Sequence, residues 1–265
     1  MAAIGPRVGT TLTFSVAVAG KGGTGKTTLA ALLIRYIRET TGKPILAIDA
    51  DPSSNLNQAL GMPLENTVGD VREEMAVRVS RGAMEPGVSK QDYLEYQIEQ
   101  ALVEGEGIDL LAMGRPEGPG CYCAANNMLR LCVDRIASSY DYLFIDNEAG
   151  LEHLSRRTTQ DVDSLVVVSD PTMRGLTAAA RVLGLVDELK TKVGRRFLVV
   201  NRVNGNLPPQ LSAAIADLKV ELVATVPVDP GVADLDAMGE PLVGIPADSP
   251  IYGAVKEIGR RLLDR

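Results

Sequence analysis

Residues 20–28 carry the feature that most limits what this chain can fold into. Glycines there let successive backbone N–H groups turn toward phosphate oxygens, Lys26 adds a positive charge, and the Thr27 hydroxyl can reach Mg²⁺. An apolar run at 12–19 precedes the stretch and a helical pattern at 27–37 follows it. The sequence therefore predicts a strand, a loop and a helix that hold a nucleotide. The spacing is that of a phosphate-binding loop, a glycine followed after four residues by Gly-Lys-Thr, in Gly20, Lys21, Gly22, Gly23, Thr24, Gly25, Lys26, Thr27 and Thr28.

The rest of the chain alternates short apolar runs with helical stretches. This is the pattern of an α/β fold, a doubly wound and mostly parallel sheet with helices on both faces. We predict one P-loop NTPase domain at 11–265, after a flexible arm at 1–10. Two charged helices, at 71–81 and 91–103, are expected on the surface outside the sheet. Strands are expected at 43–51, 108–113, 142–146, 164–169, 197–201 and 221–226, and further helices at 124–138, 178–189, 208–218 and 251–263.

Composition and charge disfavour several classes of partner. The 265 residues carry a net charge of −7, which argues against a surface for nucleic acid or anionic lipid. No apolar run is long enough to span a bilayer and the start of the chain lacks a targeting pattern, so a cytoplasmic protein is expected. Three cysteines do not form a disulfide framework, and in a reducing compartment their thiols stay available for metal.

Aspartates lie at the ends of three of the expected strands. They are Asp49 and Asp51 at one strand, Asp146 at another and Asp170 after a third, at the edge of a parallel sheet where ligands bind. Phosphoryl transfer needs a carboxylate near the metal and one that orients the attacking water. We assign Asp146 to Mg²⁺ through water and Asp51 to the attacking water, with Asp49 as the second member of the Asp49–Asp51 pair. Gly150 would let the backbone approach the γ-phosphate. A turn or cap at the strand end is the simpler alternative for each aspartate.

The sequence resembles the deviant-Walker ATPases, the class that includes MinD, ParA and the nitrogenase iron protein. The resemblance lies in Lys21 of the loop motif, the run Asp-Ala-Asp-Pro at 49–52 and the segment 146–150. The resemblance covers nearly the whole chain. It implies a homodimer that closes on ATP and in which Lys21 reaches the partner's phosphates. The alternative for Lys21 is a solvated charge in a loop. The catalytic residues expected on this basis are Lys21, Lys26, Asp51 and Asp49, and the adenine is expected near Asn201, Arg202, Pro227 and Asp229.

The segment 118–123 reads Gly-Pro-Gly-Cys-Tyr-Cys and supplies two thiols, Cys121 and Cys123, in a glycine-rich loop. Two thiolates are half of a closed site for a soft metal, which normally has four ligands. A dimer axis beside this loop would bring two pairs together. The alternative is that both thiols only pack. Cys132 falls on the apolar face of the expected helix 124–138, so we expect a core thiol there.

Cys121 and Cys123, together with the segment 146–154, resemble the CooC-type accessory ATPases, which help to insert nickel into carbon monoxide dehydrogenase, and relatives that serve acetyl-CoA synthase. The resemblance implies Ni²⁺, or Zn²⁺, bridged by the cysteine pairs of two subunits, and a nickel enzyme as client. The arm at 1–10 departs from the family, whose chains usually begin almost at the first strand. His153, the one histidine, is expected on a helix surface or behind the ligands rather than on a metal.

The function predicted from the sequence is that of an ATP-hydrolysing metallochaperone with no nucleic acid or membrane partner. A positioning ATPase of the MinD or ParA kind is the main alternative, and the amphipathic stretch 251–263 is its only sequence support. Docking of that helix onto the sheet explains the pattern equally well. A redox protein with a bridging iron–sulfur cluster is a third possibility, but the Cys-x-Cys spacing does not fit the widely separated cysteines of the nitrogenase iron protein.

Overall fold

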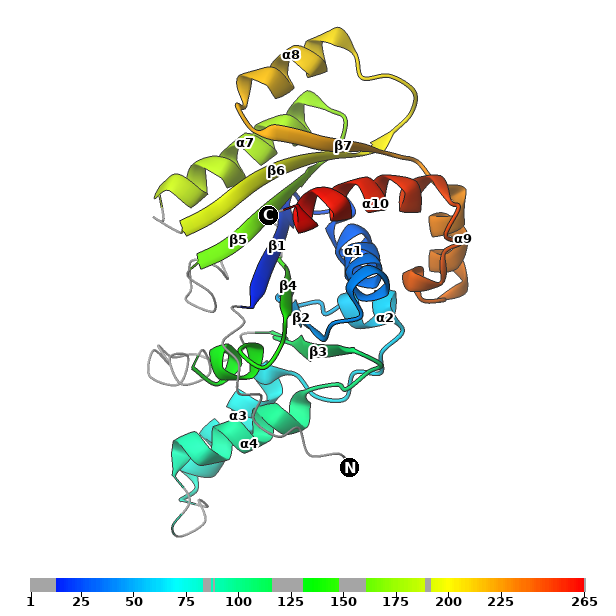
Figure 1. Ribbon diagram of the computed structural model, residues 1–265. Helices are drawn as coiled ribbons and strands as arrows, with labels where there is room; N and C mark the ends of the chain where they lie inside the picture. Colours follow the sequence, from blue (N-terminus) through cyan, green and yellow to red (C-terminus); the bar gives the residue numbers. More distant parts are fainter. Residues whose placement is uncertain are drawn as a thin grey trace.

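Seven parallel strands form one sheet, in the order β3-β2-β4-β1-β5-β6-β7 (Figure 1). The computed structural model describes residues 13–82, 87, 89–115, 131–147, 161–188 and 192–264. From β1 the strands follow the chain as β5, β6 and β7 on one side and lie in the order β4, β2 and β3 on the other, which is the doubly wound arrangement that the sequence predicts. The strands are β1 (Phe14–Gly20), β2 (Ile45–Asp49), β3 (Ile108–Ala112), β4 (Tyr142–Asp146), β5 (Asp161–Ser169), β6 (Lys192–Val203) and β7 (Glu221–Pro227).

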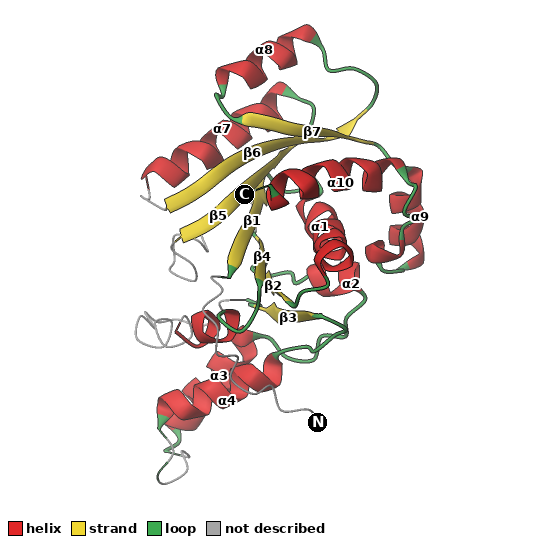
Figure 2. Ribbon diagram, in the orientation of Figure 1, coloured by secondary structure: helices red, strands yellow, loops and turns green. Residues whose placement is uncertain are grey.

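Helices cover both faces of the sheet (Figure 2). One face packs against α3 (Val68–Ser80), α4 (Lys90–Ala101), a helix at 131–137, α7 (Met173–Glu188) and α8 (Pro209–Asp217). The other packs against α1 (Lys26–Thr41), α2 (Leu56–Leu60), the short 3₁₀ helix η1 (Leu242–Gly244) and α10 (Pro250–Leu263). Strands β1, β2 and β4 are buried along their whole length, because a parallel sheet covered on both sides leaves them no solvent face.

The two charged helices lie at the surface as predicted, but one side of each packs into the core beside the sheet, which the sequence prediction did not include. Leu94 and Ile98 of α4 are fully buried, and Val71 and Met75 of α3 join the same core cluster as β2 and β3. The charges occupy only the outer side of each helix. An apolar residue every three or four positions is enough to attach such a helix to a sheet.

Helix α10 is docked through its apolar side. Ile251, Tyr252, Val255, Ile258 and Leu262 are buried in the cluster that contains α1 and β7. Packing inside the fold therefore accounts for the amphipathic pattern that the membrane alternative uses. In the part of the chain that the structure describes, no helix combines the length and the apolar character needed to cross a bilayer.

Cys132 lies in the core, as predicted, and burial raises the pKa of its thiol. Several other sequence predictions fall outside the described residues. They concern the arm at 1–10, the pair Cys121 and Cys123, and the residues Gly150 and His153.

Candidate nucleotide site

The loop between β1 and α1 has a backbone that depends on glycine at three points. Gly20, Gly23 and Gly25 have φ angles of 151°, 79° and 85°. A Cβ on Gly20 would lie 2.2 Å from the Val168 carbonyl oxygen of the neighbouring strand. Positive φ angles and close backbone approach are conditions that glycine meets at little steric cost. The structure therefore gives a physical reason for the glycines of the predicted phosphate loop.

The two lysines of the loop have different surroundings. Lys26 is 7% exposed, and its ammonium group donates to the Lys21 carbonyl oxygen at 3.3 Å. The Thr24 hydroxyl donates to the same carbonyl at 2.8 Å. The Lys21 side chain is exposed. Lys26 is thus buried inside the loop, whereas Lys21 is exposed to solvent.

Thr27 and Asp146 meet at the start of α1. The Thr27 hydroxyl donates to Asp146 Oδ2 at 2.6 Å, while Asp146 Oδ1 is buried without a hydrogen-bond partner. Burial, and then the charges of Asp49 and Asp51, raise the pKa of Asp146 to about 7, against the opposing effects of Thr27 and Lys26. A hydroxyl and an unpaired carboxylate oxygen are hard oxygen donors that suit Mg²⁺. When bound, that ion would offset the charge of the phosphates.

Asp49 and Asp51 have separate tasks in the loop after β2. The fully buried carboxylate of Asp49 accepts hydrogen bonds from the backbone N–H groups of Asp51 at 3.0 Å and Leu56 at 2.8 Å. Burial raises the pKa of Asp49 to about 6. Asp51 is partly exposed, and its Oδ1 accepts from the Ser53 N–H at 2.8 Å. Asp49 therefore shapes the loop, and Asp51 is the better placed of the two to meet a water molecule.

The loop after β2 is also connected to the edge of the sheet. The Met113 N–H donates to the Asp49 carbonyl oxygen at 2.8 Å, and the Gly69 N–H donates to the Met113 carbonyl oxygen at 3.0 Å. A cavity of about 350 Å³ lies beside this contact. Its lining comes from the loop after β2, the start of α3 and the end of β3: Pro52, Ser54, Thr67, Asp70, Glu73, Gly114 and Arg115.

The residues predicted to hold adenine make contacts within the protein. Asn201 and Arg202, at the end of β6, donate to carbonyl groups of the phosphate loop. Pro227 ends β7. The carboxylate of Asp229 accepts from the N–H groups of Gly231 at 2.9 Å and Ile251 at 3.1 Å, and so joins the starts of α9 (Pro230–Met238) and α10. Their part in binding the base stays a prediction.

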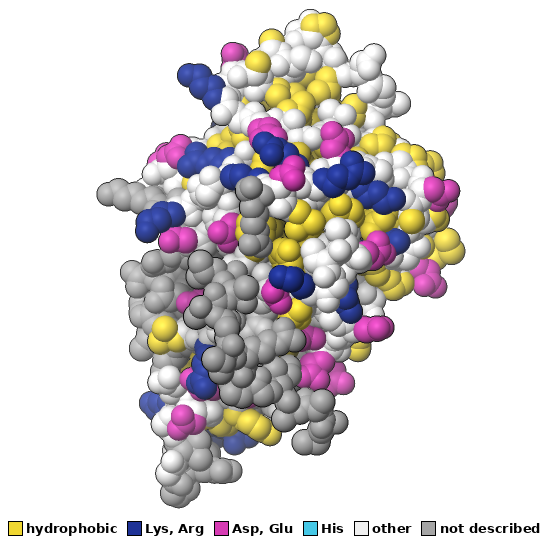
Figure 3. Space-filling view, in the orientation of Figure 1, with side chains coloured by type: hydrophobic (Ala, Val, Ile, Leu, Met, Phe, Trp, Pro, Cys, Tyr) yellow, Lys and Arg dark blue, Asp and Glu magenta, His cyan; other side chains and the backbone are white. Residues whose placement is uncertain are grey.

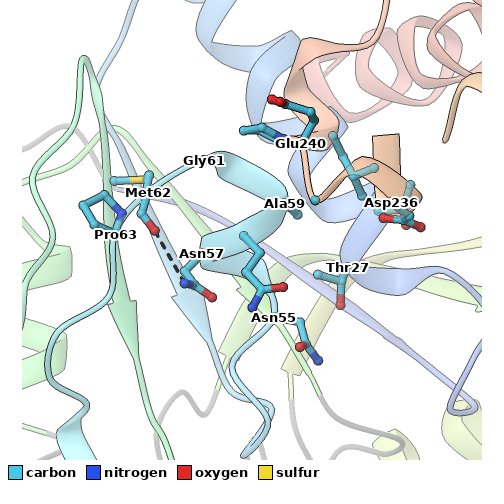
Figure 4. A pocket seen from close by; sticks show the side chains of 14 residues that line it. Thr27, Asn55, Asn57, Ala59, Gly61, Met62, Pro63, Asp236 and Glu240 are labelled. Atoms are coloured by element: carbon cyan, nitrogen blue, oxygen red, sulfur yellow. Dashed lines mark hydrogen bonds between the residues drawn. The ribbon is translucent and has the colours of Figure 1, made fainter. Parts of the chain in front are cut away.

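A larger cavity, of about 800 Å³, opens beside Thr27 and Thr28 (Figure 4). Figure 4 shows Asp236 on the side of Thr27, and Met62 and Pro63 on the opposite side. Its walls are α2 and the segment from α9 to η1, and none of these three elements was predicted from the sequence. Pro230 at the first turn and Gly239 just after the last are signals that could have revealed α9.

The described residues contain no group of three or more metal-ligating side chains that could hold an ion. The predicted soft-metal ligands, Cys121 and Cys123, are not among those residues.

Comparison with known proteins identifies the family. The model of the CobQ/CobB/MinD/ParA nucleotide-binding domain matches residues 15–242. The chain belongs to this family. Within the family, it is 43% identical over 250 residues to an uncharacterized ATP-binding protein of Methanocaldococcus jannaschii, with 94% of this chain and 98% of that protein covered. It is 32% identical over 239 residues to the carbon monoxide dehydrogenase accessory protein CooC of Rhodospirillum rubrum, with 84% and 87% covered.

The septum site-determining protein MinD of Pyrococcus horikoshii, solved with Mg-ADP, has a similar fold. The TM-score is 0.68 at 22% sequence identity, with 96% of this chain and 97% of that chain covered. Membership of the CobQ/CobB/MinD/ParA family agrees with the loop geometry at Lys26 and Thr27. The protein is a P-loop ATPase of this family.

Proposed function

We propose that this ATPase is a metallochaperone that delivers nickel to a carbon monoxide dehydrogenase or an acetyl-CoA synthase. The similarity to CooC carries the proposal, because it extends over most of both chains and CooC is named as an accessory protein of carbon monoxide dehydrogenase. The Cys121-Tyr122-Cys123 run adds a donor pair that suits the cargo.

The cargo site in this proposal belongs to the dimer. Each chain supplies the thiolates of Cys121 and Cys123, and two chains supply four sulfur ligands. Thiolates bind Ni²⁺, Zn²⁺ and Cu⁺, so the four sulfur ligands favour soft and borderline metals without selecting one of them. In this proposal the ion is nickel because the client is a nickel enzyme.

The ATPase part of the proposal uses the residues of the loop site. Backbone N–H groups at 20–28 and the ammonium group of Lys26 bind the phosphates. Asp51 orients the attacking water, and Lys21 contacts the phosphates held by the partner subunit. ATP closes the dimer in this scheme, and hydrolysis reopens it and alters the separation of the two cysteine pairs.

A nickel titration tests the proposal. The protein is reduced, freed of metal and kept without oxygen, and both thiolate-to-metal absorbance and bound nickel per chain are measured. We expect about one nickel per two chains, and loss of that binding in the double variant Cys121→Ala, Cys123→Ala. Cys132→Ala is the matched control, because its thiol lies in the core, and it should bind nickel like the wild type. Nickel binding that survives the double variant would contradict the proposal.

A positioning ATPase is the competing function, favoured by the fold similarity to MinD. The docked state of α10 weakens it, because the apolar residues of that helix are already buried. On the described part of the face in Figure 3, Lys and Arg side chains lie among Asp and Glu rather than in one basic patch. Nickel binding that does not depend on the cysteines, together with ATP-dependent binding to anionic vesicles, would favour this function instead.

A further inference from the structure

Strand β6 has a β-bulge at its carboxyl end. Val200 pairs with Thr225 of β7, and Val203 pairs with Pro227, so β6 has one residue more than β7 in this interval. The extra length falls at Asn201 and Arg202. Bulges often redirect a side chain next to a functional site. Here the two side chains turn toward the phosphate loop, which lies about 180 residues earlier in the chain.

Arg202 has an unusual backbone conformation. Its φ angle is +60°, in the left-handed region that costs a non-glycine residue on the order of 1 kcal/mol. Among the described residues, Ser54 and Lys219 are the other non-glycine residues with positive φ. The Arg202 N–H donates to the side-chain oxygen of Asn201 at 2.9 Å, which fixes the orientation of that amide. The strained backbone at Arg202 thus accompanies one defined arrangement of the Asn201 and Arg202 side chains.

The two side chains hold consecutive carbonyl groups of the phosphate loop. Arg202 Nη1 donates to the Gly23 carbonyl oxygen at 2.9 Å, and Asn201 Nδ2 donates to the Thr24 carbonyl oxygen at 2.8 Å. Gly25 packs so closely on Asn201 that a Cβ there would lie 2.4 Å from Nδ2. The loop is therefore held from its outer side by β6.

Holding the carbonyl groups also directs the N–H groups. In a trans peptide the C=O and N–H bonds point in opposite directions. A Gly23 carbonyl that faces Arg202 turns the Thr24 N–H away from β6, and a Thr24 carbonyl that faces Asn201 does the same for the Gly25 N–H. The Thr24 N–H makes only a long bond of 3.4 Å, to the Lys21 carbonyl oxygen. These N–H groups belong to the part of the loop expected to bind phosphate.

We propose that Arg202 is a positioning residue of the phosphate loop, which holds the Gly23 carbonyl outward and so sets the loop for phosphates before a nucleotide arrives. This role differs from the adenine contact that the sequence predicts. Asn201 is buried and contributes the neighbouring bond, whereas Arg202 is exposed and can be replaced without opening the core. The proposal concerns nucleotide binding and is independent of the metal cargo.

Binding of ADP and of inorganic pyrophosphate, each with Mg²⁺, tests the proposal in the variants Arg202→Gly and Arg202→Lys. We expect Arg202→Gly to weaken both ligands to the same extent, about tenfold, the size expected for one charge-assisted hydrogen bond. Its melting temperature without ligand should stay close to that of the wild type, because glycine adopts positive φ readily and this relief offsets the lost hydrogen bond. Arg202→Lys should recover part of the affinity, since an ammonium group can donate to the same carbonyl.

Arg196→Ala is the matched control. Arg196 lies on the same strand, in an exposed ion pair with Asp187, and its loss should leave both affinities unchanged. A loss of affinity in Arg202→Gly for ADP alone would overturn the proposal in favour of a base contact. Unchanged affinity for both ligands would overturn it too, whether or not the melting temperature falls.

Discussion

The hydroxyl of Thr27 donates to the carboxylate of Asp146 across 2.6 Å, and this bond joins the first turn of α1 to the end of β4. The other carboxylate oxygen, Asp146 Oδ1, is buried without a partner. A buried oxygen without a hydrogen-bond partner costs folding free energy, so a ligand that binds this oxygen would recover that cost. We therefore expect Mg²⁺ to bind beside this pair of residues.

Replacing Asp146 should weaken the response to Mg²⁺. In Asp146→Asn, we expect the Mg²⁺ concentration for half-maximal ATP hydrolysis to rise about 10–100-fold, the usual effect of losing a group that orients a metal shell. Binding of ADP in the presence of EDTA is the internal control and should change little. An unaltered Mg²⁺ dependence would show that Asp146 lies outside the shell.

The stability of the nucleotide-free protein should fall as the pH rises from about 4 to about 7. The pKa of Asp146 is raised to about 7, mainly by burial, while an unfolded aspartate titrates near 4. Between these values the folded state holds a proton that the unfolded state has lost, so raising the pH favours unfolding. Asp49, with a pKa raised to about 6, acts in the same direction over a narrower range.

Urea midpoints at pH 5 and pH 8, without Mg²⁺, measure this effect in the wild type and in Asp146→Asn. The variant should lose much of the difference between the two midpoints, because its amide does not titrate. An equal difference in both proteins would mean that Asp146 is ionised throughout this range.

Removing Lys21 should separate binding from turnover. The exposed side chain of Lys21 takes no part in the contacts that shape its own loop, which use its carbonyl group instead. Lys21→Ala should therefore bind ATP nearly normally and lose turnover by about 10³-fold, as with the loss of an arginine finger. Lys43→Ala, which removes a surface lysine paired with Asp141, is the control. Full turnover in Lys21→Ala would remove the idea of a lysine acting on the partner's phosphates.

Adding one methyl group at Gly20 should destabilise the fold. A Cβ there would lie 2.2 Å from the Val168 carbonyl oxygen, and both groups belong to central strands that cannot separate cheaply. We expect Gly20→Ala to cost about 1–3 kcal/mol of unfolding free energy, as overpacking does. Gly184→Ala, in the interior of α7 where a Cβ meets no atom within 4 Å, should stabilise slightly instead. Urea unfolding of both variants tests the contrast.

The sequence predicts most strands well because their signal is local. Strand β4 has the predicted bounds, and β1, β2, β3 and β7 differ from prediction by one or two residues at their ends, whereas β5 begins three residues and β6 five residues earlier than predicted. Helix α2 was missed because its five residues are too few to show a period. Helix α9 was missed because none of its residues is buried, so no apolar face marks it.

The parts of the candidate site that consist of neighbouring residues in the sequence could be predicted, and the contacts between distant residues could not. The phosphate loop is one continuous motif, and its expected glycines and Lys26 have conformations that suit the role. The sequence alone did not show that Asp49 shapes the loop while Asp51 stays accessible to water. That difference depends on a hydrogen bond from the Leu56 N–H to the Asp49 carboxylate, seven residues away. The contact of Arg202 with Gly23 spans 179 positions and leaves no local pattern.

The backbone bonds that join Asp49 to Met113 and Met113 to Gly69 have a consequence for communication across the sheet. Asp49 is two residues before Asp51, the aspartate assigned to the attacking water. Met113 directly follows β3 and is two residues before Arg115, the last residue that the structure describes in this segment. A displacement of the Asp49 carbonyl group cannot leave Met113 in place without breaking a bond of 2.8 Å. The ends of β2 and β3 and the start of α3 are thus joined through main-chain atoms alone, so a shift at Asp49 would be transmitted to Met113 and Gly69 without any side chain.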